Sequence, residues 1–174
     1  MTIIETLVAI SILLIALAGP LTISANGLES SLYGRDQITA SYLAQEGIEY
    51  VRNVRDTDTL TGASSWVSNL APCISSNGSM QYCNINTYIG DPTSAIRLCS
   101  GQVCPPLLLD SNTDLYQYTA GVASKFTRTI TLVPVMKDSS GNWIEYDVIS
   151  KVVWTSPLPN NVVTLSEDIY NWQQ

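Results

Sequence analysis

Residues 1–23 of this chain read MTIIETLVAISILLIALAGPLTI, and this stretch decides the fold. Glu5 is its only charged side chain, and the next formal charge along the sequence is Glu29. At about 1.5 Å of rise per residue, an uncharged helix over residues 6–28 can cross a hydrocarbon layer of roughly 30 Å. The sequence therefore predicts a membrane-spanning helix here, within a hydrophobic segment that comprises residues 1–27.

Glu5 does not prevent this segment from entering a membrane. Twelve Ile, Leu and Val side chains accompany it, and together they favour insertion by on the order of 5 kcal/mol, against a cost of about 2.5–3.5 kcal/mol for a carboxylate at the membrane centre. An anion in apolar surroundings still needs a partner charge. The chain's own Met1 amine is held about one helical turn away, so the amine of a neighbouring chain is at least as good a candidate. Glu5 therefore predicts self-association.

The run MTIIETLVAISILLIALAGP resembles the start of a processed type IV pilin or type II secretion pseudopilin. The resemblance rests on Glu5, on the uncharged helix after it, and on Gly19-Pro20, where this family tends to place a helix-weakening proline. The run YLAQEGIEYVRNVRD, residues 42–56, resembles the second helical half of pilin-like proteins. The resemblance implies that Met1, in place of the commoner Phe, is the mature and N-methylated terminus. It also implies that Glu5 pairs with the Met1 amine of the adjacent subunit during filament assembly.

A secretory signal or a simple membrane anchor is the alternative interpretation of residues 1–23. Ala16-Leu17-Ala18 resembles the cleavage site of a secretory signal, but no basic region precedes it and apolar residues continue to Ile23, which disfavours a signal or simple anchor.

At Gly19-Pro20 the missing N–H and the crowded carbonyl of Ala16 predict a kink or an unwound stretch near residues 15–22. In a filament core, neighbouring helices would cover such a melted stretch. A mere bend in a continuous helix is the alternative.

Residues 28–56 are predicted to continue the helix as an amphipathic second half. Apolar residues return at helical steps, with charged residues between them. Ion pairs between subunits are one role for the charged residues, but since exposed ion pairs contribute under about 1 kcal/mol, most of these residues are expected to be solvated surface. The apolar set is Leu28, Leu32, Leu43, Gly47, Tyr50 and Val54, and the charged set is Arg35, Asp36, Glu46, Glu49, Arg52 and Arg55.

Residues 57–174 are predicted to form an extracellular globular head with disulfides. Its four cysteines, Cys73, Cys83, Cys99 and Cys104, lie in one turn-rich region, an arrangement typical of proteins outside the cytosol. Their spacing and the absence of His from the chain do not fit a zinc site. Three pairings are possible, and the sequential one is favoured because it closes the shortest loops. The sequence leaves the choice open.

The last third of the chain alternates between apolar and polar residues, which predicts antiparallel strands with one buried face. Residues 138–142 supply a turn, residues 161–165 a third short strand, and Pro134 is expected at a strand end or edge. The predicted fold is α+β: a long N-terminal helix packed by a C-terminal antiparallel sheet. The expected inward residues are Phe126, Ile130 and Leu132 in one strand and Ile144, Tyr146, Val148, Val152 and Trp154 in the next.

The head shows no pattern of catalytic chemistry. Without His, no Ser-His or Cys-His nucleophile can be assembled, and no phosphate-binding glycine loop occurs, so neither an enzyme nor a cofactor is expected. Residues 110–114, DSNTD, open like a calcium loop, but Leu115 and Gly121 replace the Gly and Glu that such a loop needs. An ordinary polar turn is favoured and no metal is expected. Asn77-Gly78-Ser79 matches a glycosylation sequon and is read first as a surface loop.

The formal charge of −7 disfavours binding to nucleic acid. The sequence as a whole favours a structural subunit, a major pilin by preference, of an extracellular type IV pilus-like filament of the kind used in adhesion or motility. Its expected partners are copies of itself, the cytoplasmic membrane that it spans once before assembly, and the pilus assembly machinery. The alternatives are a minor pilin or pseudopilin that primes a filament in secretion or competence, and a membrane-tethered extracellular binding domain.

Overall fold

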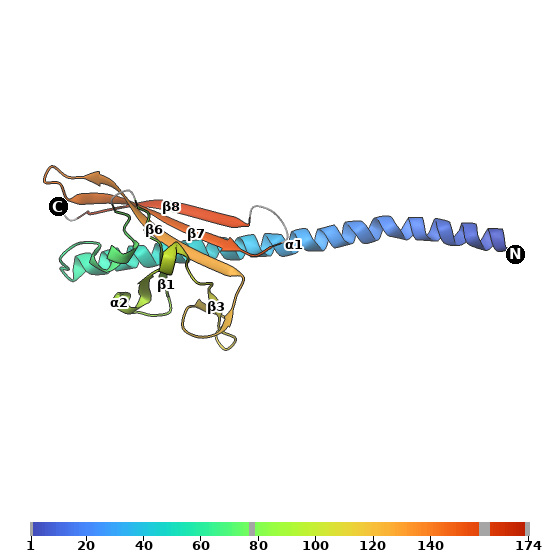
Figure 1. The fold of residues 1–174 in the computed structure, drawn as a ribbon, viewed down its shortest axis with the longest axis horizontal. Helices are drawn as coiled ribbons and strands as arrows, with labels where there is room; N and C mark the ends of the chain where they lie inside the picture. Colours follow the sequence, from blue (N-terminus) through green and yellow to red (C-terminus); the bar gives the residue numbers. More distant parts are fainter. Residues whose placement is uncertain (1, 77–78, 157–160, 173–174) are drawn as a thin grey trace. The chain divides into compact units, whose positions relative to one another are not determined.

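The computed structural model describes residues 2–76, 79–156 and 161–172. It has the predicted α+β fold, in which a 58-residue helix, α1 (Ile3–Leu60), is followed by a head of short helices and antiparallel strands (Figure 1). The chain divides into two compact units, Met1–Asp36 and Gln37–Gln174. The remaining elements are η1 (Ser68–Cys73), β1 (Cys83–Ile85), α2 (Pro92–Ala95), β2 (Ile96–Leu98), η2 (Ser100–Gln102), β3 (Leu108–Leu109), β4 (Tyr116–Gln117), β5 (Val122–Ala123), β6 (Phe126–Lys137), β7 (Trp143–Trp154) and β8 (Val162–Tyr170).

The first unit consists of the N-terminal part of α1. Among the described residues, α1 is the one helix that is long and apolar enough to cross a membrane, and its most apolar 18-residue window is entirely unburied. The helix continues through Pro20, and the hydroxyls of Thr22 and Ser24 donate to the carbonyls of Ala18 and Pro20 at 3.0 and 2.9 Å. The single chain therefore shows no unwinding near residues 15–22, because one proline removes only one backbone hydrogen bond. Melting in a packed filament stays a prediction.

The second unit is built on a five-stranded sheet with the order β2-β1-β6-β7-β8, in which all neighbours are antiparallel. The predicted meander is confirmed: β6 and β7 are joined through Asp138–Asn142, whose turn closes by a 2.9 Å backbone hydrogen bond from Asp138 to Asn142. β8 is longer than the predicted strand at residues 161–165. A small sheet, β4-β3-β5, was not predicted, because its strands are only two residues long.

Pro134 lies inside β6 instead of at its end. The register between β6 and β7 shifts directly after it, between Pro134 and Met136. β1 pairs with β6 only at Ile130, so this stretch of β6 lies beyond the bridge to β1. A proline is tolerated at such an irregular position because the ladder there does not require its missing N–H.

The core lies between the sheet and residues 37–60 of α1. The predicted inward positions of β6 and β7 are buried, except that Ile144 is only partly buried, and the helix buries Leu43 and Val54 as expected. Gly47 brings the two layers together, since a Cβ at this position would lie 2.8 Å from Ile130 Cδ1. Leu28 and Leu32, predicted on the same stripe, belong to the first unit and are exposed. The helix also buries Ala40, Ala44, Ile48 and Val51.

Candidate assembly surface

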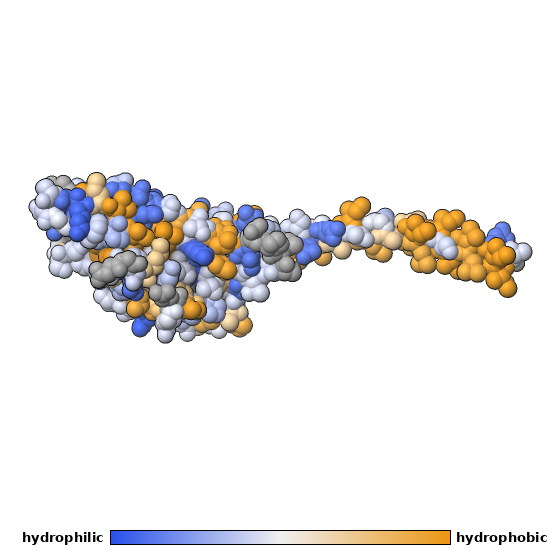
Figure 2. All heavy atoms as spheres, turned by 45° about the horizontal axis from the view of Figure 1, so that its top comes forward, coloured by the Kyte–Doolittle hydropathy of each residue, from blue (hydrophilic) through white to orange (hydrophobic). Residues whose placement is uncertain are grey.

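The apolar side chains of the first unit are exposed. All twelve Ile, Leu and Val residues between Ile3 and Ile23 have exposed fractions between 52% and 82%. Figure 2 shows this end of the chain as an almost continuous hydrophobic surface, which soluble proteins rarely expose. A surface of this kind needs either lipid or other protein side chains to cover it. We define residues 3–23 as the apolar segment.

Glu5 closes a capping box at the start of α1. The backbone N–H of Thr2 donates to the Glu5 carboxylate, and the N–H of Glu5 donates to the Thr2 hydroxyl, both at 3.4 Å. The T-x-x-E spacing at residues 2–5 was the signal for this arrangement, and sequence reasoning missed it. Both contacts are long and the carboxylate is exposed, so Glu5 keeps capacity for a charged partner. Met1 lies outside the described residues, and pairing of Glu5 with a Met1 amine stays a prediction.

In the second unit, a buried arginine fastens the helix to the sheet. Arg128 of β6 has no exposed surface, and its guanidinium donates to the carbonyl of Leu43 at 2.9 Å and to the carboxylate of Glu46 at 2.8 Å. It also donates to the carbonyl of Ile85 at 2.7 Å, and Thr87 holds the other Glu46 oxygen at 2.6 Å. Glu46 is therefore paired within the chain although its side chain stays 42% exposed, and it is an exception to the expectation that most of these charges are solvated surface. The alternation of β6 was the missed signal, since Arg128 falls on the buried face.

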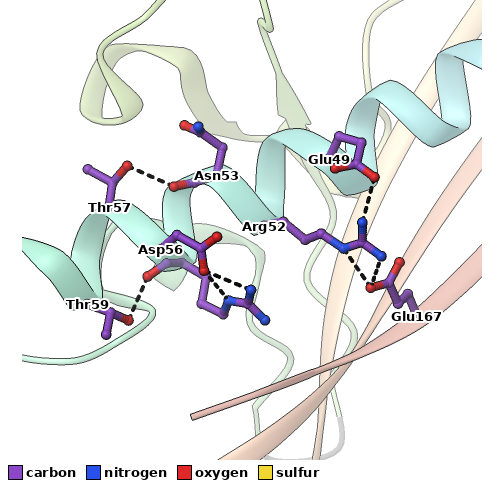
Figure 3. Close-up of polar contacts among 8 residues, drawn as sticks. Glu49, Arg52, Asn53, Asp56, Thr57, Thr59 and Glu167 are labelled. Atoms are coloured by element: carbon purple, nitrogen blue, oxygen red, sulfur yellow. Dashed lines mark hydrogen bonds and ion pairs between the residues drawn. The ribbon is translucent and has the colours of Figure 1, made fainter. Parts of the chain in front are cut away.

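Arg52 makes a second link between α1 and the sheet. Its guanidinium pairs with Glu49 at 2.6 Å, and its Nε donates to Glu167 of β8 at 2.7 Å (Figure 3). The hydrogen bond to Glu167 raises the pKa of Arg52 above its usual value. Arg55 pairs with Asp56 at 2.7 Å on the same stretch. Most of the charged residues on this stretch were expected to be solvated surface, and partial exposure keeps each of these pairs worth little.

The predicted sequential disulfide pairing is confirmed. Cys73 is bonded to Cys83, which ties η1 to β1, and Cys99 is bonded to Cys104, which closes a short loop after β2. All four cysteines are buried. Disulfides of this kind are typical of oxidising compartments, and together with the apolar N-terminal helix they favour an anchored or exported protein over a cytosolic one.

The Asp110–Asp114 segment forms a polar turn. The Asp110 carboxylate accepts hydrogen bonds from Asn112 N at 2.9 Å and from Gln117 Nε2 at 3.1 Å, and Asp114 adopts a φ of 55°. Both carboxylate oxygens of Asp110 therefore accept hydrogen bonds from residues of this turn or next to it. Across the described ranges, no group of three or more His, Cys, Asp or Glu side chains is placed to hold a metal ion. Asn77 and Gly78 of the sequon lie outside the described residues.

Comparisons with protein-family models, with curated proteins and with solved structures found no match to this chain. Three features of the chain bear on its function: the exposed apolar segment, the single carboxylate near its start, and a head that is locked to the second half of the same helix.

Proposed function

We propose that this chain is a structural subunit of an extracellular filament of the type IV pilin class, with the role of major subunit preferred. The observation that carries the proposal is the exposure of all twelve large aliphatic side chains of the apolar segment. Full burial of one such side chain is worth about 1.5–3 kcal/mol in water. Helix-to-helix packing of many copies would bury the whole set at once, and a lipid bilayer would do the same for a single anchored chain. Glu5, for which a simple anchor has no use, favours the filament over the anchor.

Glu5 supports packing with a defined offset between subunits. Within an apolar bundle a lone carboxylate costs several kcal/mol unless a cation neutralises it, on the order of the penalty for one buried ion. The Met1 amine of an adjacent subunit would supply that cation in the proposed filament. Since one end of one copy would contact a different part of the next, the contact is heterologous and produces an open helical assembly instead of a closed ring.

The same segment explains where the subunit would wait before assembly. An uncharged helix of this length would span the cytoplasmic membrane once, with the head in the oxidising space outside, where its two disulfides form. Transfer from lipid to filament would exchange one apolar environment for another. The pilus assembly machinery would drive this exchange, and the fibre would then lie at the cell surface.

The test compares Glu5→Ala with Glu29→Ala in cells that express the full chain. Both changes remove one exposed carboxylate from α1, but only Glu5 lies in the apolar segment. We expect filaments sheared from the Glu29→Ala cells to contain this chain as their main subunit by intact mass. Glu5→Ala cells should lack such filaments while their membrane pool of the subunit persists. Glu5→Gln should behave like Glu5→Ala, since the amide caps the helix but carries no charge.

Other results would contradict the proposal. Filaments that form equally well from the Glu5 variants would show that assembly does not depend on this carboxylate. Filaments that contain the chain only in trace amounts would favour a minor pilin or pseudopilin. A chain that stays in the membrane, with no filament in either control or variant cells, would favour a tethered extracellular binding domain.

A further inference from the structure

A small cavity in the head contains hydrogen-bond donors that no other part of the described chain uses. It has a volume of about 230 Å³ and lies between the β1–β2 pair and residues 105–119. Three of its residues come from one face of the β1–β2 pair. Asn84 is directly opposite Arg97, and Asn86 follows two residues later, where its N–H donates to the carbonyl of Ala95 at 2.9 Å. Asn86 is the diagonal neighbour of Arg97, and a side chain as long as that of arginine can reach toward it at this spacing.

Asn86 presents the first donor. The residue is only 3% exposed, and its Nδ2 has no hydrogen-bond partner within the described part of the chain. Its Oδ1 is engaged, since it accepts a hydrogen bond from Tyr88 N at 3.4 Å. A buried N–H that is left without an acceptor is costly, and native proteins usually satisfy it with a bound group or with water. Since Asn86 lines the cavity, a group bound there can supply the acceptor that its amide lacks.

Arg97 presents the second donor. It is exposed at the mouth of the cavity, and no described carboxylate pairs with it. Arg52, Arg55 and Arg128 all hold carboxylates, in a chain with fifteen acidic and eight basic residues. Asp91, which lies beside Ser94 of the cavity wall, is already committed to the cap of α2 through Thr93 and Ser94. In so acidic a chain, an arginine that has no carboxylate partner among the described residues is available to an anion from outside.

The other polar groups around the cavity are occupied. The Thr119 hydroxyl donates to Gln117 at 2.7 Å, and the Tyr118 hydroxyl donates to the carbonyl of Arg128 at 3.3 Å. Asn84 Nδ2 makes a long contact of 3.9 Å with Cys99 Sγ. The remaining wall is apolar, from Ile89, Ala95 and Pro105. Two donors without a described acceptor, together with the apolar side chains of Ile89, Ala95 and Pro105, define the ligand that fits.

We propose that this cavity binds a small monocarboxylate. One carboxylate oxygen accepts from Asn86 Nδ2 and the guanidinium of Arg97 holds the anion, while a compact uncharged remainder contacts Ile89, Ala95 and Pro105. A carboxylate matches both the planar fork of arginine and the single positive charge. The cavity is smaller than the usual 300–1,000 Å³ range of drug-sized sites, which limits the remainder to a few heavy atoms. The proposal does not depend on filament assembly.

The test uses the full-length chain, labelled with ¹⁵N, in detergent micelles at constant ionic strength. Propionate is titrated while the side-chain amide resonance of Asn86 is followed, and propionamide serves as the neutral ligand of nearly equal shape. We expect a saturable shift with propionate and at least a tenfold weaker response to propionamide. Arg97→Gln should weaken propionate binding at least tenfold, because a hydrogen bond to a charged group is lost. Arg97→Lys should bind propionate more weakly than the parent chain and more tightly than Arg97→Gln.

Lys151→Gln is the matched control, since it removes one exposed positive charge from β7, away from the cavity. It should bind propionate as the parent chain does. Equal shifts with propionate and propionamide, or unchanged binding by Arg97→Gln, would overturn the proposal and leave water as the acceptor for Asn86. Glucuronate, titrated in parallel, should bind more weakly than propionate, because its remainder is too large and too polar for this cavity, and tighter binding would contradict the proposed ligand. Backbone resonances outside the cavity report whether each variant is folded.

Discussion

The two parts of helix α1 share a backbone conformation but differ in where their apolar side chains find partners. Residues 3–36 expose almost every large apolar side chain, whereas residues 37–60 bury an apolar stripe, including Leu43 and Val54, against the sheet. The second part also holds Glu46 and Arg52 in ion pairs with strands, while residues 6–28 carry no formal charge. Helix formation alone therefore does not explain which apolar side chains of α1 are buried. The first part requires partners outside the chain, and the second part has them within it.

The largest expected effect on stability comes from breaking the link of the second part to the sheet. Arg128→Ala leaves the carbonyls of Leu43 and Ile85 without their buried donor and removes one of the two donors to the partly exposed Glu46. We expect a loss of about 3–5 kcal/mol in unfolding free energy, since each of the two carbonyls left without this donor costs about 1–3 kcal/mol. Urea unfolding of the full chain in detergent, followed by tryptophan fluorescence, measures it. Lys151→Ala should change it by less than about 0.5 kcal/mol. A loss below about 1 kcal/mol for Arg128→Ala would contradict the importance of this clamp.

The next effect should come from the disulfides, which lie only in the second unit. In the chain-entropy account, opening the Cys73–Cys83 loop costs about 3 kcal/mol and opening the shorter Cys99–Cys104 loop about 2 kcal/mol. Replacing each pair by alanines tests this, again by urea unfolding. The helicity of the apolar segment, followed by circular dichroism in detergent, should stay unchanged. Equal or reversed losses for the two pairs would show that strain or packing, and not loop length, dominates.

The same substitution at two glycines of α1 compares the two parts directly. At Gly47 a new Cβ would lie 2.8 Å from Ile130 Cδ1 and 3.1 Å from Ser150 Oγ, so Gly47→Ala should cost about 1–3 kcal/mol through overpacking. At Gly19 no described atom other than the adjacent residues and the neighbouring backbone of the helix itself lies within 4 Å of the new Cβ. Gly19→Ala should leave the unfolding of the head unchanged and raise local helix stability by about 0.5–1 kcal/mol. A destabilised head in Gly19→Ala, or a neutral Gly47→Ala, would contradict this division of the helix.

Much of the fold could be predicted because its signals are local. The uncharged run after Glu5 predicts a long helix, the alternation around Ile130 and Tyr146 predicts a sheet with one buried face, and the clustered cysteines predict two short disulfide loops. These patterns depend on neighbouring residues, so a single sequence contains them. The small β4-β3-β5 sheet could not be found in the same way, because strands of two residues have no period.

The polar contacts were harder to predict because their partners are far apart in the sequence. Glu46 and Arg128 are 82 residues apart, and Arg52 and Glu167 are 115 residues apart. Each side chain, taken by itself, is indistinguishable from a solvated charge. The inward position of Arg128 in β6 was nevertheless visible in the alternation, and a buried arginine implies an acid on the element packed against it. The Thr2–Glu5 capping box was local and could have been found.

The smallest predicted effect concerns two like charges that face each other in the sheet. Asp147 of β7 is directly opposite Asp168 of β8, and burial, together with the nearby Asp168 charge, raises the pKa of Asp147. A raised pKa in the folded state means that the ionised form opposes folding, so this penalty is present at neutral pH and disappears as Asp147 takes up its proton on acidification. Asp168→Asn should therefore stabilise the head at pH 7, by up to about 0.5 kcal/mol because solvent screens the pair, and by nothing below about pH 4. Glu29→Gln removes one negative charge from the first part of α1 and should change the unfolding free energy at neither pH. If the gain in unfolding free energy of Asp168→Asn persisted below about pH 4, packing and not charge would be its cause.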